Sequence, residues 1–166
     1  MTATTSPHPT ILVVDDESTI VRLIQAMLEP AGFQVLTATG SAEALKICKT
    51  HPSPIDILLT DLILPAPTFS ISSGNNEFPH VHGHELASRA LQIRETLRIV
   101  LMSGNIDKDL AGYGIRRGTV PFVPKPFEQQ ELKDTLRHAL QGPPTKEADL
   151  QKQAPERAKE LDGWVD

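Results

Sequence analysis

The chain contains little cysteine and no long hydrophobic run. Cys48 is the one cysteine among 166 residues, so no disulfide can form within the chain. Tryptophan also occurs once, at Trp164 in a polar C-terminal stretch. No run approaches the roughly 18 consecutive apolar residues of a membrane-spanning helix, and residues 1–10 lack the pattern of a signal peptide. We therefore expect a cytoplasmic protein that makes no contact with a membrane.

Clustered positive charge is also missing. The 16 Lys and Arg residues are outnumbered by 21 Asp and Glu, which gives a formal net charge of −5. Binding to nucleic acid through phosphates requires clustered basic side chains, and the one adjacent basic pair is Arg116-Arg117. We therefore expect no direct contact with nucleic acid. The length fits one domain with a tail.

Short apolar runs alternate with helical patterns five times between residues 10 and 141. Apolar runs predict strands, and apolar residues at helical spacing predict helices. We expect Ser18 and Ser41 to cap the first two helices. Such alternation requires crossover connections and a parallel sheet covered on both faces. The predicted fold is a flavodoxin-like, doubly wound α/β domain of five βα units with strand order 2-1-3-4-5. The expected strands are 11–14, 34–38, 55–60, 98–102 and 120–123, and the expected helices are 18–29, 42–49, 84–93, 107–117 and 128–141.

Composition divides the rest of the chain. Residues 1–9 are expected to form a flexible N-terminus, and residues 10–141 the domain. Within the domain, residues 66–82 are rich in Pro, Ser, Gly, Asn and His, without any period, and are expected to form an inserted loop. After Gly142-Pro143-Pro144 the chain is mostly charged and polar, which favours a linker or disordered tail over 142–166. A short helix that docks on the domain is the alternative.

Polar side chains follow four of the five predicted strands. They are Asp15 and Asp16 after the first strand, Asp61 after the third, Ser103 after the fourth and Lys125 after the fifth. The carboxyl ends of parallel strands share one edge of the sheet, where such folds bind their ligands. Three carboxylates that meet there repel one another. A hard divalent cation relieves this repulsion, and Mg²⁺ fits because it binds one or two carboxylates together with phosphate oxygens.

These groups would also make a cradle for a phosphoryl group. Lys125 supplies a positive charge and Ser103 a hydroxyl donor, while a central carboxylate can act as the nucleophile. Phosphoryl transfer requires mainly positioning and charge neutralisation. Each residue has a structural explanation when taken alone. Asp15 and Asp16 can be charges at a helix N-terminus, Asp61 and Ser103 can be turn residues, and Lys125 can be a solvated lysine. Their joint placement at the strand ends favours the phosphoryl site.

Residues 10–141 resemble the receiver domain of two-component response regulators, most closely the receivers associated with hybrid histidine kinases. The matching segments are ILVVDDE at 11–17, TDLILP at 60–65, LMSG at 101–104 and VPKPF at 123–127. The resemblance implies that Asp61 accepts a phosphoryl group from a sensor histidine kinase or a histidine phosphotransfer protein. It also implies that Asp16, Asp61 and the backbone carbonyl of Ile63 bind Mg²⁺ directly, and that Asp15 binds it through water.

The resemblance further implies a switch. Ser103 would reorient onto the phosphoryl group, Lys125 would pair with it, and Phe122 would turn inward on activation. The peptide bond between Lys125 and Pro126 is expected to be cis. We expect a bacterial single-domain regulator, monomeric or weakly dimeric, that is not an enzyme and that controls a protein target or relays its phosphate.

The chain departs from the family pattern after Pro65. Seventeen residues, 66–82, separate Pro65 from Gly83, where the family has a much shorter connection. This segment is interpreted as a lid over the site, a docking arm or a neutral insertion. Alternating His80, His82 and His84 make a transition-metal site conceivable.

Two other functions stay open. The first is an aspartyl-nucleophile phosphatase, which typically carries a second carboxylate two residues after the nucleophile. Apolar Ile63 stands there instead, which disfavours hydrolysis and predicts a long-lived phosphoryl group. The second is an interaction module that works without phosphorylation, which the complete set of polar groups at the strand ends disfavours.

Overall fold

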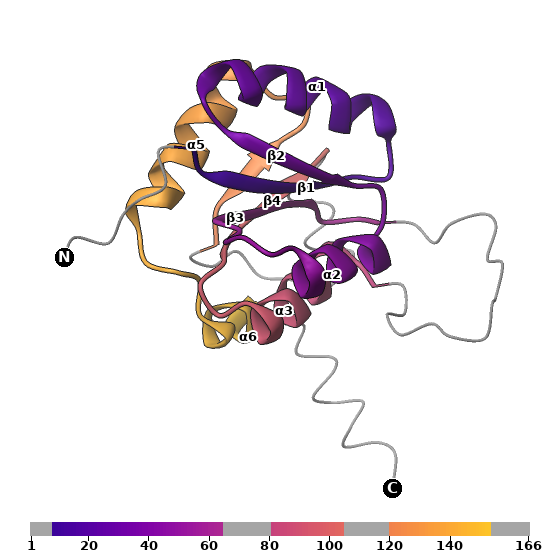
Figure 1. Cartoon of the computed structure of the whole chain (residues 1–166), viewed down its shortest axis with the longest axis vertical. Helices are drawn as coiled ribbons and strands as arrows, with labels where there is room; N and C mark the ends of the chain where they lie inside the picture. The colour runs from indigo at the N-terminus through magenta and orange to yellow at the C-terminus, as the bar shows by residue number, and fades with distance from the viewer. Residues whose placement is uncertain (1–7, 65–80, 105–119, 154–166) are drawn as a thin grey trace, which may run out of the picture.

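The computed structural model describes residues 8–64, 81–104 and 120–153, with side chains to Leu150. Its centre is a five-stranded parallel sheet in the order β2-β1-β3-β4-β5 (Figure 1). The predicted fold class and strand order are therefore confirmed. The strands are β1 (Thr10–Val14), β2 (Gln34–Ala38), β3 (Ile57–Asp61), β4 (Arg98–Ser103) and β5 (Phe122–Pro124).

Helices cover both faces of the sheet. Helices α1 and α5 lie on one face, and α2, α3 and α6 on the other (Figure 1). The helix predicted over 107–117 lies outside the described residues. The bounds are α1 (Ser18–Leu28), followed by a 3₁₀ turn (Glu29–Ala31), α2 (Ser41–Thr50), α3 (Gly83–Ile93), α5 (Gln129–Gln141) and α6 (Glu147–Gln153).

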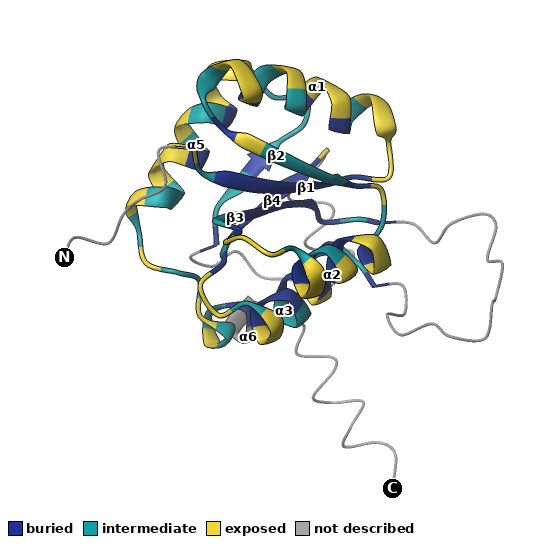
Figure 2. Ribbon diagram, viewed as in Figure 1, coloured by how far each residue is buried: buried dark blue, intermediate teal, exposed yellow. Residues whose placement is uncertain are grey.

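Side chains that alternate along the strands build two cores, one on each side of the sheet. Leu12, Leu58 and Leu101 pack towards α2 and α3, while Val13 and Leu59 pack towards α1 and α5. Every residue of β1 and β3 is buried, as expected for central strands of a sheet covered on both faces (Figure 2). The carboxyl ends of these two central strands therefore lie side by side.

The predicted helix caps are wrong. Ser18 and Ser41 are the first residues of their helices, and the cap positions are Glu17 and Gly40, neither with a side-chain capping bond. The Ser41 hydroxyl is turned elsewhere: its Oγ accepts a hydrogen bond from the Val81 backbone N–H at 2.9 Å. Ser41 thus holds the backbone just before α3, a long-range role that local sequence does not reveal.

After residue 141 the described part of the segment follows the alternative expectation of a short docking helix, rather than that of a linker or disordered tail. Thr145 bonds to the sheet twice: its N–H donates to the Leu97 carbonyl at 3.0 Å, and its Oγ1 accepts from the Ile99 N–H at 2.9 Å. Helix α6 then packs on α3, and Leu150 is buried in the core on that side. One leucine among charged residues gave a weak signal, yet its burial joins residues 145–150 to the domain.

Cys48 is buried in α2, and burial raises the pKa of its thiol to about 11. Its thiol is therefore a packed apolar group. In the parts of the chain that the structure describes, no helix combines the length and apolar character needed to cross a membrane.

Candidate functional site

Three carboxylates meet at the carboxyl edge of the sheet. Asp15 and Asp16 follow β1, Asp61 ends the neighbouring β3, and one oxygen from each lies within 4.8 Å of the others. Asp15 is fully buried and Asp61 is 8% exposed, whereas Asp16 faces solvent. The sequence-predicted acidic cluster is therefore present, with Asp16 on its open side.

Lys125 reaches this cluster from the end of β5. Its Nζ donates hydrogen bonds to Asp15 Oδ2 at 2.5 Å and to Asp61 Oδ2 at 2.9 Å. Its backbone N–H donates to the Ser103 carbonyl at 2.8 Å, which fixes the stem of the lysine against β4. The peptide bond between Lys125 and Pro126 is cis, as the resemblance implied. The ammonium thus lies between two acidic groups from different strands.

The surroundings shift the titration of these groups. Burial raises the pKa of Asp61, and the hydrogen bond and charge of Lys125 oppose that shift only in part. Burial and the neighbouring Asp15 also raise the pKa of Asp16. For Lys125, burial acts to lower the pKa, but the bonds to Asp15 and Asp61 outweigh it and the pKa is raised. The site therefore keeps its ammonium while it disfavours ionisation of Asp16 and Asp61.

The loop after β3 is closely tied to Asp61. Asp61 Oδ1 accepts a hydrogen bond from the Ile63 N–H at 3.2 Å, and the Leu62 N–H donates to the Met102 carbonyl at 2.8 Å. Gly83, at the start of α3, lies directly against this turn. A Cβ on Gly83 would stand 2.0 Å from the Asp61 carbonyl oxygen, so only glycine fits there. The backbone that carries Asp61 is thus packed against α3.

Ser103 is the last residue of β4, and Phe122 is the first residue of β5. Ser103 is fully buried at the end of β4, opposite Pro124 in the sheet register. Phe122 is half-buried and packs against the core under α3. Ser103 ends the strand that pairs with β3, whereas Phe122 begins the strand beyond it, and their movement on phosphorylation stays a prediction.

Two of the three alternating histidines have different partners. His82 Nδ1 accepts a hydrogen bond from the Leu64 N–H at 3.0 Å, and His84 Nε2 bonds to the Leu150 carbonyl at 2.9 Å. His80 lies outside the described residues, as does most of the expected insertion. Within the described ranges the one group of three or more potential metal ligands is Asp15, Asp16 and Asp61. The two described histidines thus give no support to a shared transition-metal site.

Sequence reasoning missed several supports of the site. The Glu17 N–H donates to Asp15 Oδ1 at 2.9 Å, which orients the buried carboxylate. The sequence analysis named Gly83 and His82, but it did not predict their contacts with the loop after β3. A glycine after a long insertion was the available signal for a close approach of backbones, whereas nothing local indicated the bond of His82.

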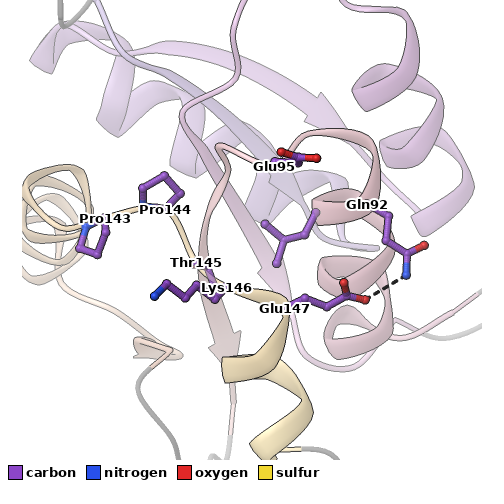
Figure 3. A pocket seen from close by; sticks show the side chains of 8 residues that line it. Gln92, Glu95, Pro143, Pro144, Thr145, Lys146 and Glu147 are labelled. Carbon is purple, nitrogen blue, oxygen red and sulfur yellow. Dashed lines mark hydrogen bonds between the residues drawn. The ribbon is translucent and has the colours of Figure 1, made fainter.

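A separate cavity of about 510 Å³ lies far from this edge. It opens between the end of α3 and the C-terminal segment, beside Gln92, Pro144 and Lys146 (Figure 3). The Glu147 carboxylate beside it accepts a hydrogen bond from the Gln92 amide at 3.0 Å (Figure 3). This cavity contains no part of the acidic cluster. The charge and geometry of the strand ends therefore identify the candidate site better than cavity size does.

Comparisons with known proteins agree with this arrangement. Residues 11–68 match the model of the response regulator receiver domain. The alkaline phosphatase synthesis transcriptional regulatory protein PhoP of Bacillus subtilis (strain 168) is 29% identical over 130 residues, which cover 78% of this chain and 48% of that protein. The chain spans about half the length of the first curated relatives that it matches.

Solved structures show the same likeness. A response regulator receiver domain protein from Clostridium thermocellum has a TM-score of 0.63 and 28% identity, with 80% of this chain and 94% of that chain covered. The receiver domain of the hybrid histidine kinase CckA has a TM-score of 0.59 and 25% identity, with 79% and 98% covered. By its motifs, its strand order and these likenesses, the chain contains a response regulator receiver domain.

Proposed function

We propose that Asp61 accepts a phosphoryl group from the phosphohistidine of a sensor histidine kinase or a histidine phosphotransfer protein. The observation that carries this proposal is the position of Asp61, at the edge of the sheet between the Lys125 ammonium and two further carboxylates. No net turnover is required, so the domain would act as a switch rather than as an enzyme.

The proposed step is an in-line displacement. An oxygen of Asp61 attacks the phosphorus, an O–P bond forms, and the P–N bond to the donor imidazole breaks. The donor histidine, protonated on its other ring nitrogen, leaves as neutral imidazole. Little covalent work falls to the protein, because such transfers depend on positioning and on neutralising charge. Lys125, already 2.9 Å from Asp61 Oδ2, is placed to pair with a new phosphoryl oxygen.

The residues present fit a Mg²⁺ site. Three carboxyl groups lie around a single ammonium, and the ligand set is all oxygen, as Mg²⁺ prefers. Asp16, Asp61 and the Ile63 carbonyl would hold the ion, and Asp15 would act through water. The bound ion would neutralise charge on the phosphoryl oxygens. Asp15 itself is bonded to Lys125 and to the Glu17 N–H, which suits an indirect role.

Phosphorylation would act by shifting a population between two conformations. Ser103 would turn onto the phosphoryl group and Phe122 would follow, which changes the surface offered to a downstream protein. We place this switch in the cytoplasm, in a monomeric or weakly dimeric protein that passes its signal by protein contact or by phosphorelay. The apolar Ile63 near Asp61 offers no group to orient a hydrolytic water, and we expect a long-lived phosphoryl state.

The test uses the whole chain, Mg²⁺ and a small phosphodonor such as acetyl phosphate, followed by intact mass. We expect a stable gain of one phosphoryl group that needs Mg²⁺ and that Asp61→Asn abolishes. Asp56→Asn serves as the matched control, because Asp56 precedes β3 and bonds to the Thr10 N–H instead. Continuous release of phosphate would indicate a hydrolase, and no mass gain would indicate a module that works without phosphorylation; either result would overturn the proposal.

A further inference from the structure

Three successive residues, Val81, His82 and Gly83, fix the described chain at the start of α3. The Val81 N–H donates to Ser41 Oγ, the His82 ring accepts from Leu64, and the Gly83 N–H donates to the Leu62 carbonyl at 3.0 Å. These contacts join the start of α3 to the loop after β3 and to the start of α2. His82 is the central member of the three.

The side chain of His82 does not do what its position suggests. It occupies the cap position of α3, where a polar side chain usually accepts a bond from the first turn of its own helix. Here the side chain makes no capping bond. Instead Nδ1 accepts from the Leu64 backbone N–H at 3.0 Å, across a sequence separation of 18 residues. This bond requires an imidazole whose Nδ1 carries a free lone pair, with the proton on Nε2.

Leu64 belongs to the short turn that shapes the site. Starting from Asp61, the Leu62 N–H is held by Met102, the Ile63 N–H by Asp61 Oδ1, and the Leu64 N–H by His82. The side chains of Leu62 and Leu64 are both buried, so the turn is fixed on its core side as well. His82 thus completes a continuous set of bonds along the backbone that would present the Ile63 carbonyl to a cation.

We propose that His82 is a positioning residue for phosphoryl acceptance, which holds the turn after Asp61 through the bond from Leu64 to Nδ1. This inference rests on the function proposed above and names a residue outside the polar groups of the strand ends. His82 touches neither phosphate nor metal in this role. It sets the place of the Ile63 carbonyl and so the affinity for Mg²⁺ and the rate of phosphorylation.

The test compares three variants of the whole chain. His82→Phe keeps a ring but removes the acceptor, and His82→Asn restores an acceptor at the same distance along the side chain as Nδ1. His138→Phe, at an exposed histidine of α5, is the matched control. Amide hydrogen exchange at Leu64 is measured by NMR without Mg²⁺ or phosphodonor. Mg²⁺ affinity is measured by calorimetry, and phosphorylation by acetyl phosphate is measured by intact mass.

We expect His82→Phe to speed exchange at Leu64 and to weaken Mg²⁺ binding, each by about fivefold or more, the factor that corresponds to one lost hydrogen bond. Its phosphorylation should slow, and raised Mg²⁺ should restore part of the rate. His82→Asn should stay within about twofold of the original chain, as should His138→Phe. Thermal unfolding establishes that each variant is folded.

Two results would overturn the inference. One is a folded His82→Phe that matches the original chain in exchange and in Mg²⁺ affinity. The other is an Asn variant as impaired as the Phe variant, since the acceptor would then not be the cause. An original chain that gains no phosphoryl group overturns the function proposed above instead. In that case Leu64 exchange and Mg²⁺ affinity still decide whether His82 holds the turn.

Discussion

The ammonium of Lys125 lies 2.9 Å from Asp61 Oδ2 while it also donates to the fully buried Asp15. One cation therefore serves two carboxylates on different strands, β1 and β3. Any change in the charge of one partner alters the balance at the other. The first prediction below derives from this shared ammonium.

Lys125→Met should destabilise the domain and nearly abolish phosphorylation. Loss of the Lys125 ammonium leaves Asp15 buried without a cation, which costs roughly 2–4 kcal/mol of unfolding free energy. The phosphorylation rate should fall on the order of 100-fold, as when a preorganised donor is removed. Urea unfolding and the rate of mass gain measure the two effects. Lys46→Met, at an exposed position of α2, is the control and should change neither.

Asp61→Asn should stabilise the Mg²⁺-free protein at neutral pH. The pKa of Asp61 is raised by burial, so the folded state binds a proton more tightly than the unfolded state does. Stability contributed by that proton is present in acid and is lost as the pH rises through the folded-state pKa. The advantage of Asp61→Asn should therefore grow as the pH rises from about 4. Urea unfolding across this range measures it, and an advantage that shrinks with rising pH would contradict the argument.

Mg²⁺ should raise the melting temperature through the acidic cluster. At ten times its Kd, a ligand that binds the folded state adds about 1.4 kcal/mol, or roughly 3–6 °C for a domain of this size. Asp16→Asn should remove most of this gain, because Asp16 is the exposed carboxylate of the cluster. Calorimetric scans with and without Mg²⁺ provide the measurement. Glu43→Gln, on α2, should keep the full gain.

Gly83→Ala should disturb the site although it changes no polar group. The added methyl would lie 2.0 Å from the Asp61 carbonyl oxygen, so α3 or the β3 turn has to move. We expect a loss of at least about 2 kcal/mol in unfolding free energy and slower phosphorylation. Gly40→Ala is the matched control, since a Cβ there meets nothing within 4 Å. Equal stability of the two variants would show that the contact is easily relieved.

Leu150→Ala should destabilise the domain by roughly 2–4 kcal/mol, as for other large-to-small changes in a core. Leu150 is 1% exposed and belongs to the core shared by α2 and α3. A linker or disordered tail would predict no effect. Urea unfolding distinguishes the two, with Lys146→Ala, at an exposed neighbouring position, as the control.

The sequence predicted the sheet and the polar strand ends because both depend on local pattern. The apolar runs of β1 and β3 end abruptly at Asp15 and Asp61, and parallel order alone brings these residues together. The bond from Lys125 to two carboxylates follows from the same geometry. Regular periodicity therefore carried most of the fold and the centre of the site.

Long-range contacts of single side chains were beyond reach. Ser41 gave the local signal of a helix cap, yet its hydroxyl binds Val81, 40 residues away. His82 gave the signal of a metal ligand, yet its ring accepts a bond from Leu64. The C-terminal segment docks through Thr145 and Leu150. Two separate residues do not form a periodic pattern in the sequence. Each of these contacts depends on the position of backbone that is distant in the sequence.

The docking of α6 on α3 also fixes where a fused reporter should be attached. A fluorescent protein that replaces residues 154–166 would begin on the side of the sheet that carries α2 and α3, opposite α1 and α5 (Figure 1). Such a fusion would therefore begin away from the face of the sheet that α1 and α5 cover. A label that replaces residues 143–166 would remove Leu150 and Thr145 and would report on an altered fold.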